Sequence, residues 1–243
     1  MTQKIAFIFD LDGTLVDSVY AHVLAWQQAF LDEDIPVSGW SIHRRIGMSG
    51  DLFVRTLLRE QKIPATAQLS ERLSDSHKAR YEKLSGILKP LPGAFELLRH
   101  LKDTQTDFAI ATTAEQQTAE ADLKRLGVDS SQVVLITRAD VQHGKPDPEI
   151  FQLAAQRLNL DVRDAIVVGD SIWDMLCVQR AGGFGVGLLS GGYAKEELER
   201  AGAHRVYVDA LDLLAHLEEV GGPRPPDVDL MPTNAIARSA RKR

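Results

Sequence analysis

This sequence has very little cysteine, and no hydrophobic run in it approaches the length of a membrane span. Cys177 is the single cysteine among 243 residues, which excludes an intrachain disulfide and a zinc site built from several cysteines. The apolar run at residues 5–9 stops at Asp10, so it is too short for a signal-peptide core or a transmembrane helix. We therefore expect a cytoplasmic protein in a reducing compartment, with no membrane partner.

Excess positive charge is also missing. The chain has 28 lysines and arginines against 34 aspartates and glutamates, a net charge of −6. Because phosphate backbones attract basic surfaces, this balance argues against nucleic acid as a partner. It still allows a small anionic substrate, since one pocket can be positive on a negative protein. The length suits one large α/β domain, or a core domain with a smaller insert.

Short apolar runs alternate with helical patterns along most of the chain. Runs typical of buried strands lie at residues 5–9, 108–111, 133–136, 165–168, 185–189 and 206–208. Apolar residues at helical spacing lie at residues 94–102, 118–126, 149–158, 172–181 and 211–217. This alternation predicts an α/β fold, with a doubly wound, mostly parallel sheet covered by helices on both faces.

The segment from residue 18 to residue 88 breaks this alternation. It shows only helical periodicity, at 19–31, 41–46, 51–60 and 69–84, and it is too long for an ordinary βα connection. We therefore expect an inserted all-α domain at 18–88 and a core formed by 1–17 and 89–220. Residues 221–243 contain four prolines and end in basic residues, which predicts a flexible tail.

Two aspartates, Asp10 and Asp12, follow the first apolar run. At this spacing an extended chain directs both side chains to the same side, and Gly13 permits a tight turn at the carboxyl edge of the sheet. Two carboxylates this close repel unless a cation neutralises them, and oxygen ligands suit Mg²⁺. A screened carboxylate can attack phosphorus while its neighbour moves the proton. A solvated acidic turn is the simpler alternative for the same residues.

Residues 9–18, Phe-Asp-Leu-Asp-Gly-Thr-Leu-Val-Asp-Ser, resemble the first signature of the haloacid dehalogenase superfamily, in the form found in its phosphatase and phosphomutase branches. The resemblance implies a Rossmann-like core in which Asp10 is the nucleophile and Asp12 the general acid/base. It implies that Mg²⁺ is bound by the carboxylate of Asp10 and the backbone carbonyl of Asp12. It also implies that the helical insert is a cap of the first (C1) type.

Three further motifs of this family follow in the expected order. The resemblance implies that the Thr112 hydroxyl and the Thr113 backbone N–H bind a phosphoryl oxygen, and that Lys145, in Gly-Lys-Pro, neutralises the phosphoryl group. Asp170 follows the run at 165–168 and would bind Mg²⁺. Asp174, one helical turn on, would hold a water of the metal shell or orient Lys145. The implied metal site therefore consists of Asp10, Asp12, Asp170 and Asp174.

Each of these residues also has a structural alternative when taken alone. Thr112 and Asp170 are suitable helix caps, Lys145 is an ordinary surface lysine, and Asp174 is an acid favoured in a first helical turn. The order of the four motifs, each at a strand end, favours the functional interpretation. The resemblance covers approximately residues 4–215.

The segment at residues 43–51 is where we expect the cap to contact the substrate, since the cap selects the leaving group in this family. Arg45, Gly47 and Ser49 are the candidate binding residues, and Arg44 or Arg45 would grip a second anionic group. An exposed helix–loop–helix is the alternative. His22, His43, His77 and His143 are scattered without metal-ligand spacing, Trp26, Trp40 and Trp173 are expected to pack in the core or at its rim, and Cys177 is expected to be buried.

The predicted function is a Mg²⁺-dependent phosphatase for a small phosphorylated metabolite. A phosphomutase of the β-phosphoglucomutase type is the main alternative, but that branch tends to have glutamate where this chain has Gly169, lacks Asp174, and has lysine where this chain has Glu115. Phosphoglycolate, a sugar phosphate and a nucleoside monophosphate all remain open as substrates. So does the choice between a monomer and a homodimer.

More distant alternatives fit the sequence less well. A dehalogenase would lack Asp12, and a phosphonate hydrolase would need a Schiff-base lysine, for which Lys62, Lys78 and Lys83 show no special context. A receiver-like signalling domain has no room for the insert. A non-catalytic signalling scaffold should have lost one of the four motifs.

Overall fold

A six-stranded parallel sheet forms the centre of the core in the computed structural model, which describes residues 5–225. The strands are β1 (Ala6–Phe9), β2 (Asp107–Ala111), β3 (Val134–Ile136), β4 (Ala165–Gly169), β5 (Phe184–Leu188) and β6 (Ala203–Tyr207), in the order β3-β2-β1-β4-β5-β6. All five pairings are parallel, as predicted. The winding direction reverses between β1 and β4, so the carboxyl end of β1 lies at the switch point where such sheets bind ligands.

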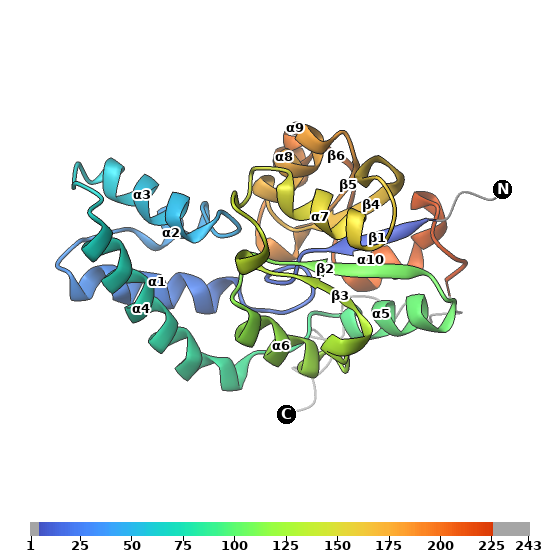
Figure 1. The fold of residues 1–243 in the computed structure, drawn as a ribbon, viewed down its shortest axis with the longest axis horizontal. Coiled ribbons are helices and arrows are strands. Elements are labelled where there is room, and N and C mark those ends of the chain that lie inside the picture. Colours follow the sequence, from blue (N-terminus) through green and yellow to red (C-terminus); the bar gives the residue numbers. More distant parts are fainter. Residues whose placement is uncertain (1–4, 226–243) are drawn as a thin grey trace, which may run out of the picture.

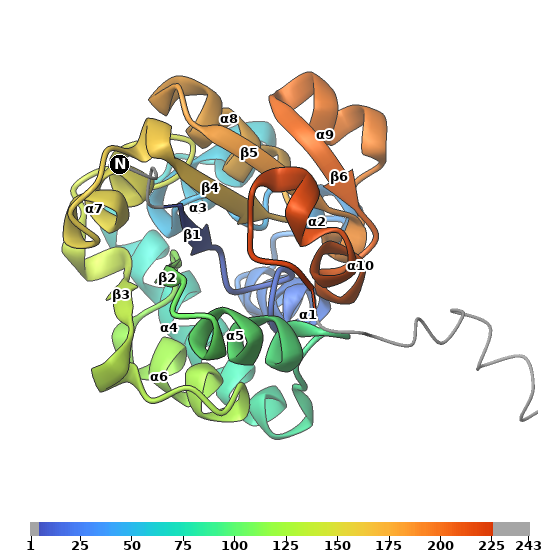
Figure 2. The ribbon, with the colours of Figure 1, turned by 90° about the vertical axis from the view of Figure 1, so that its right-hand side faces the viewer.

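Helices cover both faces of this sheet (Figure 2). They are α5 (Ala94–Asp103), α6 (Gln116–Arg125), α7 (Glu149–Arg157), α8 (Ile172–Ala181), α9 (Lys195–Ala201) and α10 (Ala210–Ala215). Short 3₁₀ turns lie at Ser85–Ile87, Ser130–Gln132, Arg138–Asp140, Val162–Asp164, Leu189–Gly191 and Leu217–Val220. The predicted α/β architecture with helices on both sides is therefore confirmed.

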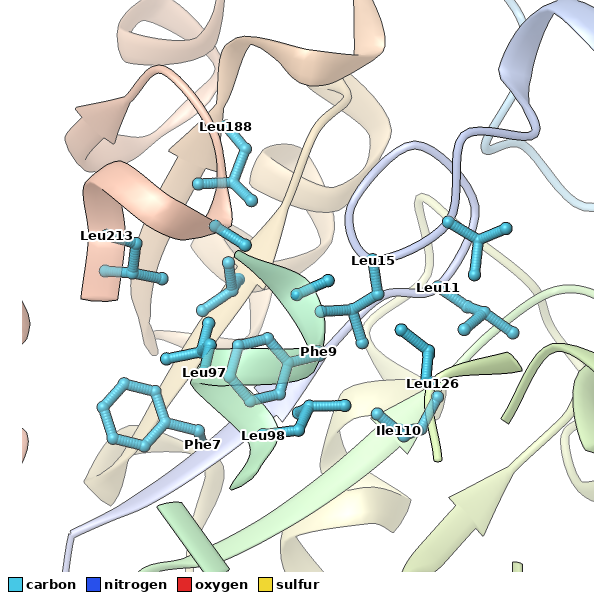
Figure 3. Packing of buried hydrophobic residues seen from close by; sticks show 14 of the residues in the cluster. Phe7, Phe9, Leu11, Leu15, Leu97, Leu98, Ile110, Leu126, Leu188 and Leu213 are labelled. Atoms are coloured by element: carbon cyan, nitrogen blue, oxygen red, sulfur yellow. The ribbon is translucent and has the colours of Figure 1, made fainter. Parts of the chain in front are cut away.

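Alternate residues of β1 enter the two layers of the core. Phe7 and Phe9 pack with leucines of α5 and α10, among them Leu97 and Leu213 (Figure 3). Ile8 points to the other face and belongs to the cluster formed with α7 and α8. Cys177 of α8 is fully buried in that second cluster, as expected. Because β1 is buried on both faces, its last residue, Phe9, is held in a fixed position. Asp10 follows directly and is positioned by it.

Four helices between β1 and β2 form a separate lobe, seen on the left of Figure 1. They are α1 (Val19–Asp32), α2 (Gly39–His43), α3 (Gly50–Glu60) and α4 (Ala67–Leu84). This lobe has its own buried cluster, which includes Trp26, Phe30, Leu57 and Leu73. Within residues 5–225, no helix has both the length and the apolar character needed to cross a membrane.

The observed elements differ from the predicted ones mainly at their ends. Helix α9 has no counterpart in the prediction because its sequence is almost entirely charged, with Leu198 and Ala201 as its buried residues. Helix α2 ends at His43 rather than at residue 46, where the chain turns toward Gly47 with a φ of +94°. The expectation that Trp40 packs in the core or at its rim is wrong, since it is 72% exposed. Residues 226–243 of the predicted tail lie outside the described residues.

Candidate active site

The end of β1 delivers Asp10 to the carboxyl edge of the sheet. The Asp10 N–H donates to the carbonyl of Val168 in β4 at 2.9 Å, so the strand ladder extends to Asp10 itself, and the residue is 4% exposed. Gly13 follows with a φ of +82°, and a Cβ at this position would collide with the carboxylate of Asp170. The tight turn therefore requires glycine, and it brings the first and last acidic motifs together.

Lys145 lies at the centre of the acidic cluster. Its ammonium is fully buried, with Nζ 2.5 Å from Oδ1 of Asp10 and 2.8 Å from Oδ1 of Asp174. Burial disfavours the charged form, but these two carboxylates outweigh it and raise the pKa of Lys145. The other oxygen of Asp174 accepts hydrogen bonds from the N–H and hydroxyl of Ser171, which fixes the carboxylate at the start of α8. Lys145 is thus held between two positioned carboxylates.

Asp10, Asp170 and Asp174 form a buried group whose carboxylate oxygens lie within 4.8 Å of one another. Oδ1 of Asp170 accepts a hydrogen bond from the Thr14 hydroxyl at 2.7 Å. Burial, followed by the charges of Asp174 and Asp10, raises the pKa of Asp170 well above its usual value. Burial also raises the pKa of Asp10, against the opposing charge of Lys145. One ammonium among three carboxylates leaves excess negative charge, and such a set fits a hard divalent cation.

Asp12 lies beside this group but has different partners. Its Oδ1 accepts from the Ser18 hydroxyl at 2.6 Å and lies 3.2 Å from Nε2 of His22, while the Thr112 hydroxyl is 3.5 Å from Oδ2. Burial acts to raise the pKa of Asp12, but His22 and Ser18 together lower it below its usual value. The metal set expected from the sequence included Asp12 through its backbone carbonyl, and its side chain does not join the three-carboxylate group.

His22 contacts Asp12, and His77 contacts His22, an arrangement that the sequence did not reveal. Nδ1 of His22 lies 3.0 Å from Nε2 of His77, and the two rings stack between Tyr81 and Trp26. Burial, together with the charge of His22, holds the pKa of His77 well below its usual value. Scattered spacing was the only sequence signal for these histidines, and the packing of α1 against α4 brings them together.

The two threonines after β2, Thr112 and Thr113, lie near Asp12 and the pocket. The Thr112 N–H continues the strand ladder to Ile136 of β3, and its buried hydroxyl accepts the N–H of Ala114 at 3.1 Å. Thr113 is partly exposed and lines the pocket above Asp10. Thr113 is therefore accessible to a ligand in the pocket, whereas the Thr112 hydroxyl is held by its contacts with Ala114 and Asp12.

The segment expected to bind substrate divides into two parts. Arg45 and Gly47 line the pocket, whereas Ser49 is buried and donates its N–H to the carbonyl of Lys145 at 3.2 Å. Arg44 points away toward the core, where its guanidinium pairs with Glu197 and stacks over Tyr193. The cap is therefore fastened to the core next to Lys145, and Arg44 is engaged outside the pocket.

A cavity of about 240 Å³ lies between the helical lobe and the sheet edge. Asp10, Asp12, Arg45, Gly47 and Thr113 line it, so five of the predicted catalytic, metal and substrate-binding residues meet there. Lys145, Asp170 and Asp174 lie beneath its floor, in contact with or near Asp10. The remaining lining comes from His22, Trp26, Ile46, Met48, Gly50, Asp51, Phe53, Ser74, His77, Lys78, Tyr81, Glu82, Ala114, Glu115, Thr118 and Arg138.

Asp122 of α6 is a buried acid outside this group, and it should make stability depend on pH. Its carboxyl is 1% exposed, pairs with Arg125 at 2.5 Å, and has a pKa raised to about 6, chiefly by burial and then by Asp12. As pH rises, the unfolded chain releases this proton at a lower pH than the folded protein does. Deprotonation therefore stabilises the unfolded state relative to the folded one. Relative to Asp122→Asn, the wild type should therefore lose about 2 kcal/mol of unfolding free energy between pH 4.5 and pH 7.5. Urea titrations of both proteins measure this, and a constant difference would contradict it.

Comparisons with known proteins identify the family of this chain. A profile of the haloacid dehalogenase-like hydrolase family matches residues 6–182. Hexitol phosphatase A of Escherichia coli is 29% identical over 243 residues, covering 93% of this chain and 97% of that protein. β-Phosphoglucomutase of Bacillus subtilis is 29% identical over 191 residues, covering 76% of this chain and 84% of that protein. The crystal structure of a hydrolase from Pseudomonas syringae is 49% identical, with a TM-score of 0.86, and covers 89% of this chain and 99% of that one. The chain therefore belongs to the haloacid dehalogenase-like hydrolase family.

Proposed function

We propose that this enzyme is a Mg²⁺-dependent phosphatase that hydrolyses a small phosphorylated metabolite through an aspartyl-phosphate intermediate. The main support is the position of Asp10, whose carboxylate lines the pocket on one side and contacts the buried Lys145 ammonium on the other. A nucleophile at the floor of a pocket with a fixed cation behind it suits attack on a dianionic phosphate. Membership of a hydrolase family argues against the receiver-like and non-catalytic alternatives.

In the first half of the proposed reaction, a carboxylate oxygen of Asp10 forms a bond to phosphorus as the bond to the leaving oxygen breaks. Asp12 gives that oxygen a proton. Without substrate, the charge of His22 and the hydrogen bonds of His22 and Ser18 outweigh burial and keep the pKa of Asp12 low. The charge of an arriving phosphate dianion raises this pKa and favours the protonated form. In the second half, water attacks the phosphoryl group, Asp12 takes a proton from it, and Asp10 is released.

Three other residues support the transferred group. Lys145 offsets its negative charge, and the hydroxyl of Thr112 and the backbone N–H of Thr113 are the proposed donors to its oxygens. Arg45, Gly47 and Ser49 are proposed to shape the leaving-group side, with Ser49 acting through its contact with the Lys145 loop. Asp10, Asp170 and Asp174, with the Asp12 carbonyl, would hold Mg²⁺. When bound, the ion would neutralise the carboxylates and the phosphoryl oxygens.

A phosphomutase remains the second candidate, because a β-phosphoglucomutase is among the relatives. Gly169 and Glu115 favour the phosphatase, since the mutase branch tends to have glutamate and lysine at these positions. Glucose 1-phosphate separates the two functions. Rapid conversion to glucose 6-phosphate with little phosphate release would support the mutase.

Phosphate release from a panel of phosphometabolites, with p-nitrophenyl phosphate as a generic substrate, tests the proposed function. We expect turnover with Mg²⁺ and a loss of at least about 100-fold in EDTA, because the excess negative charge of the site then repels the substrate. Readdition of Mg²⁺ should restore the rate. Activity that persists in EDTA, or a panel without any phosphate release, would contradict the proposal.

A further inference from the structure

We propose that the pocket selects a phosphate ester whose leaving group is uncharged and hydroxylated, such as a sugar or a polyol, and selects against one that carries a carboxylate or a second phosphate. The inference rests on the proposed phosphatase activity and concerns the cap side of the pocket. The residues at its floor, Asp10, Asp12 and Lys145, are the ones proposed to act on the phosphate group itself. What the rest of the pocket binds depends on the charges of its lining, on its aromatic side chains and on its volume.

Every basic side chain that lines the described pocket already has an acidic partner from this chain. Arg45 pairs with Glu60 and donates two further hydrogen bonds to Ser41. The Lys78 ammonium lies 2.6 Å from Glu115, and the Arg138 guanidinium lies 3.2 Å from Asp51. Of the two histidines of the wall, His77 adds no positive charge, since burial holds its pKa well below its usual value. His22 is already paired with Asp12 at 3.2 Å.

The acidic residues of the wall balance the basic ones in number. Arg45, Lys78 and Arg138 face Asp51, Glu82 and Glu115, and Asp10 and Asp12 lie at the floor. An exposed ion pair is weak, so a ligand carboxylate would be able to displace one of these acids. The displaced acid and Glu82 would nevertheless stay close to the ligand. Their negative charges would then repel the carboxylate of the ligand. Selection therefore comes from repulsion rather than from a missing contact.

The remaining wall is aromatic. The ring of Trp26 lies 4.1 Å from that of His77 and 4.6 Å from that of Phe53, and His22 stacks on Tyr81 at 4.0 Å. These rings stack on one another, so they present an apolar lining for a carbon skeleton mainly through their edges. Ser74 and Thr118 of the same lining have hydroxyl groups that suit the hydroxyls of a ligand. The cavity of about 240 Å³ lies below the usual range of ligand pockets, about 300–1,000 Å³. One small ring or a short chain fits this description.

Matched pairs of substrates test the selection in the wild-type enzyme with Mg²⁺. Sorbitol 6-phosphate and 6-phosphogluconate share an open six-carbon chain and differ at one terminal carbon, a hydroxymethyl group against a carboxylate, as do glycerol 3-phosphate and 3-phosphoglycerate. We expect kcat/KM to be at least about 10-fold higher for the neutral member of the pair that is turned over best. Equal values, or preference for the carboxylated member, would overturn the inference.

Neutralising the acidic partners should change this ratio in a defined direction. Glu115→Gln releases Lys78 and Glu60→Gln releases Arg45, so each should raise kcat/KM for the carboxylated member about 3- to 10-fold relative to the neutral one, mainly through KM. Glu96→Gln on α5 makes the same charge change on the exposed surface outside the pocket and should leave the ratio unaltered. An unchanged ratio in both pocket variants would refute the charge argument.

The generic substrate separates failure of this inference from failure of the proposed function. Hydrolysis of p-nitrophenyl phosphate without hydrolysis of any neutral sugar or polyol phosphate would leave the phosphatase in place and reject the leaving-group inference. No hydrolysis of p-nitrophenyl phosphate or of any panel member would reject the phosphatase itself.

Discussion

Replacing Asp10 with asparagine should lower kcat for phosphate release by roughly 10⁴-fold or more. Asparagine keeps the size and shape of the side chain but has no anionic oxygen to form the bond to phosphorus. Asp12 is unsuitable as a substitute, because its Oδ1 is already engaged by Ser18 and His22. The loss should therefore appear in kcat for every substrate of the panel, whatever its leaving group.

The same substitution should leave the fold intact. Burial raises the pKa of Asp10, so the ionised form is disfavoured in the native state, and removing its charge also removes repulsion from Asp174 and Asp12. Lys145 retains Asp174 as its partner at 2.8 Å. Urea unfolding should thus give a free energy no lower than that of the wild type. Asp129→Asn, at an exposed position outside the pocket, is the control that should retain activity. Activity above about 1% in Asp10→Asn would contradict its assignment as nucleophile.

The floor of the site was accessible from the sequence because its residues are defined by the sheet. Asp10, Lys145 and Asp170 each follow a strand or a turn with a local signature, and parallel strands bring their carboxyl ends to one edge. The strand order then decides which ends lie close together, and here β1 lies between β2 and β4, so their motifs meet. The buried ion pairs of Lys145 follow from this arrangement.

The upper part of the site was not accessible in the same way. His22 and His77 are separated by 55 residues and meet only because α1 packs on α4, which no local pattern encodes. Arg45 was expected to grip a second anion, yet the decisive fact is that Glu60 already occupies its guanidinium. Periodicity indicates which face of a helix is buried, but not which charged side chains of different helices form ion pairs. Substrate selection depends on that second kind of information.

Replacing Lys145 with methionine should be the most destabilising change in the site. Lys145 is fully buried between Asp10 and Asp174, and both carboxylates lose their counter-charge when it is removed. Breaking a buried ion pair from one side typically costs about 3–5 kcal/mol, because the partner is left charged in a low-dielectric interior. Methionine fills a similar volume, so the loss reports charge rather than a cavity. Urea unfolding in EDTA measures it without a contribution from Mg²⁺.

Lys78→Met is the matched control, because Lys78 makes an ion pair of similar length with Glu115 but is 47% exposed. Solvent screens such pairs, so its removal should lower the unfolding free energy far less than the removal of Lys145. The contrast between the two lysines isolates the effect of burial. Added Mg²⁺ should stabilise Lys145→Met by binding the same three carboxylates, since a ligand that binds only the native state raises the unfolding free energy. Equal costs for the two lysines, or no response of Lys145→Met to Mg²⁺, would show that Lys145 does not hold the acidic group together.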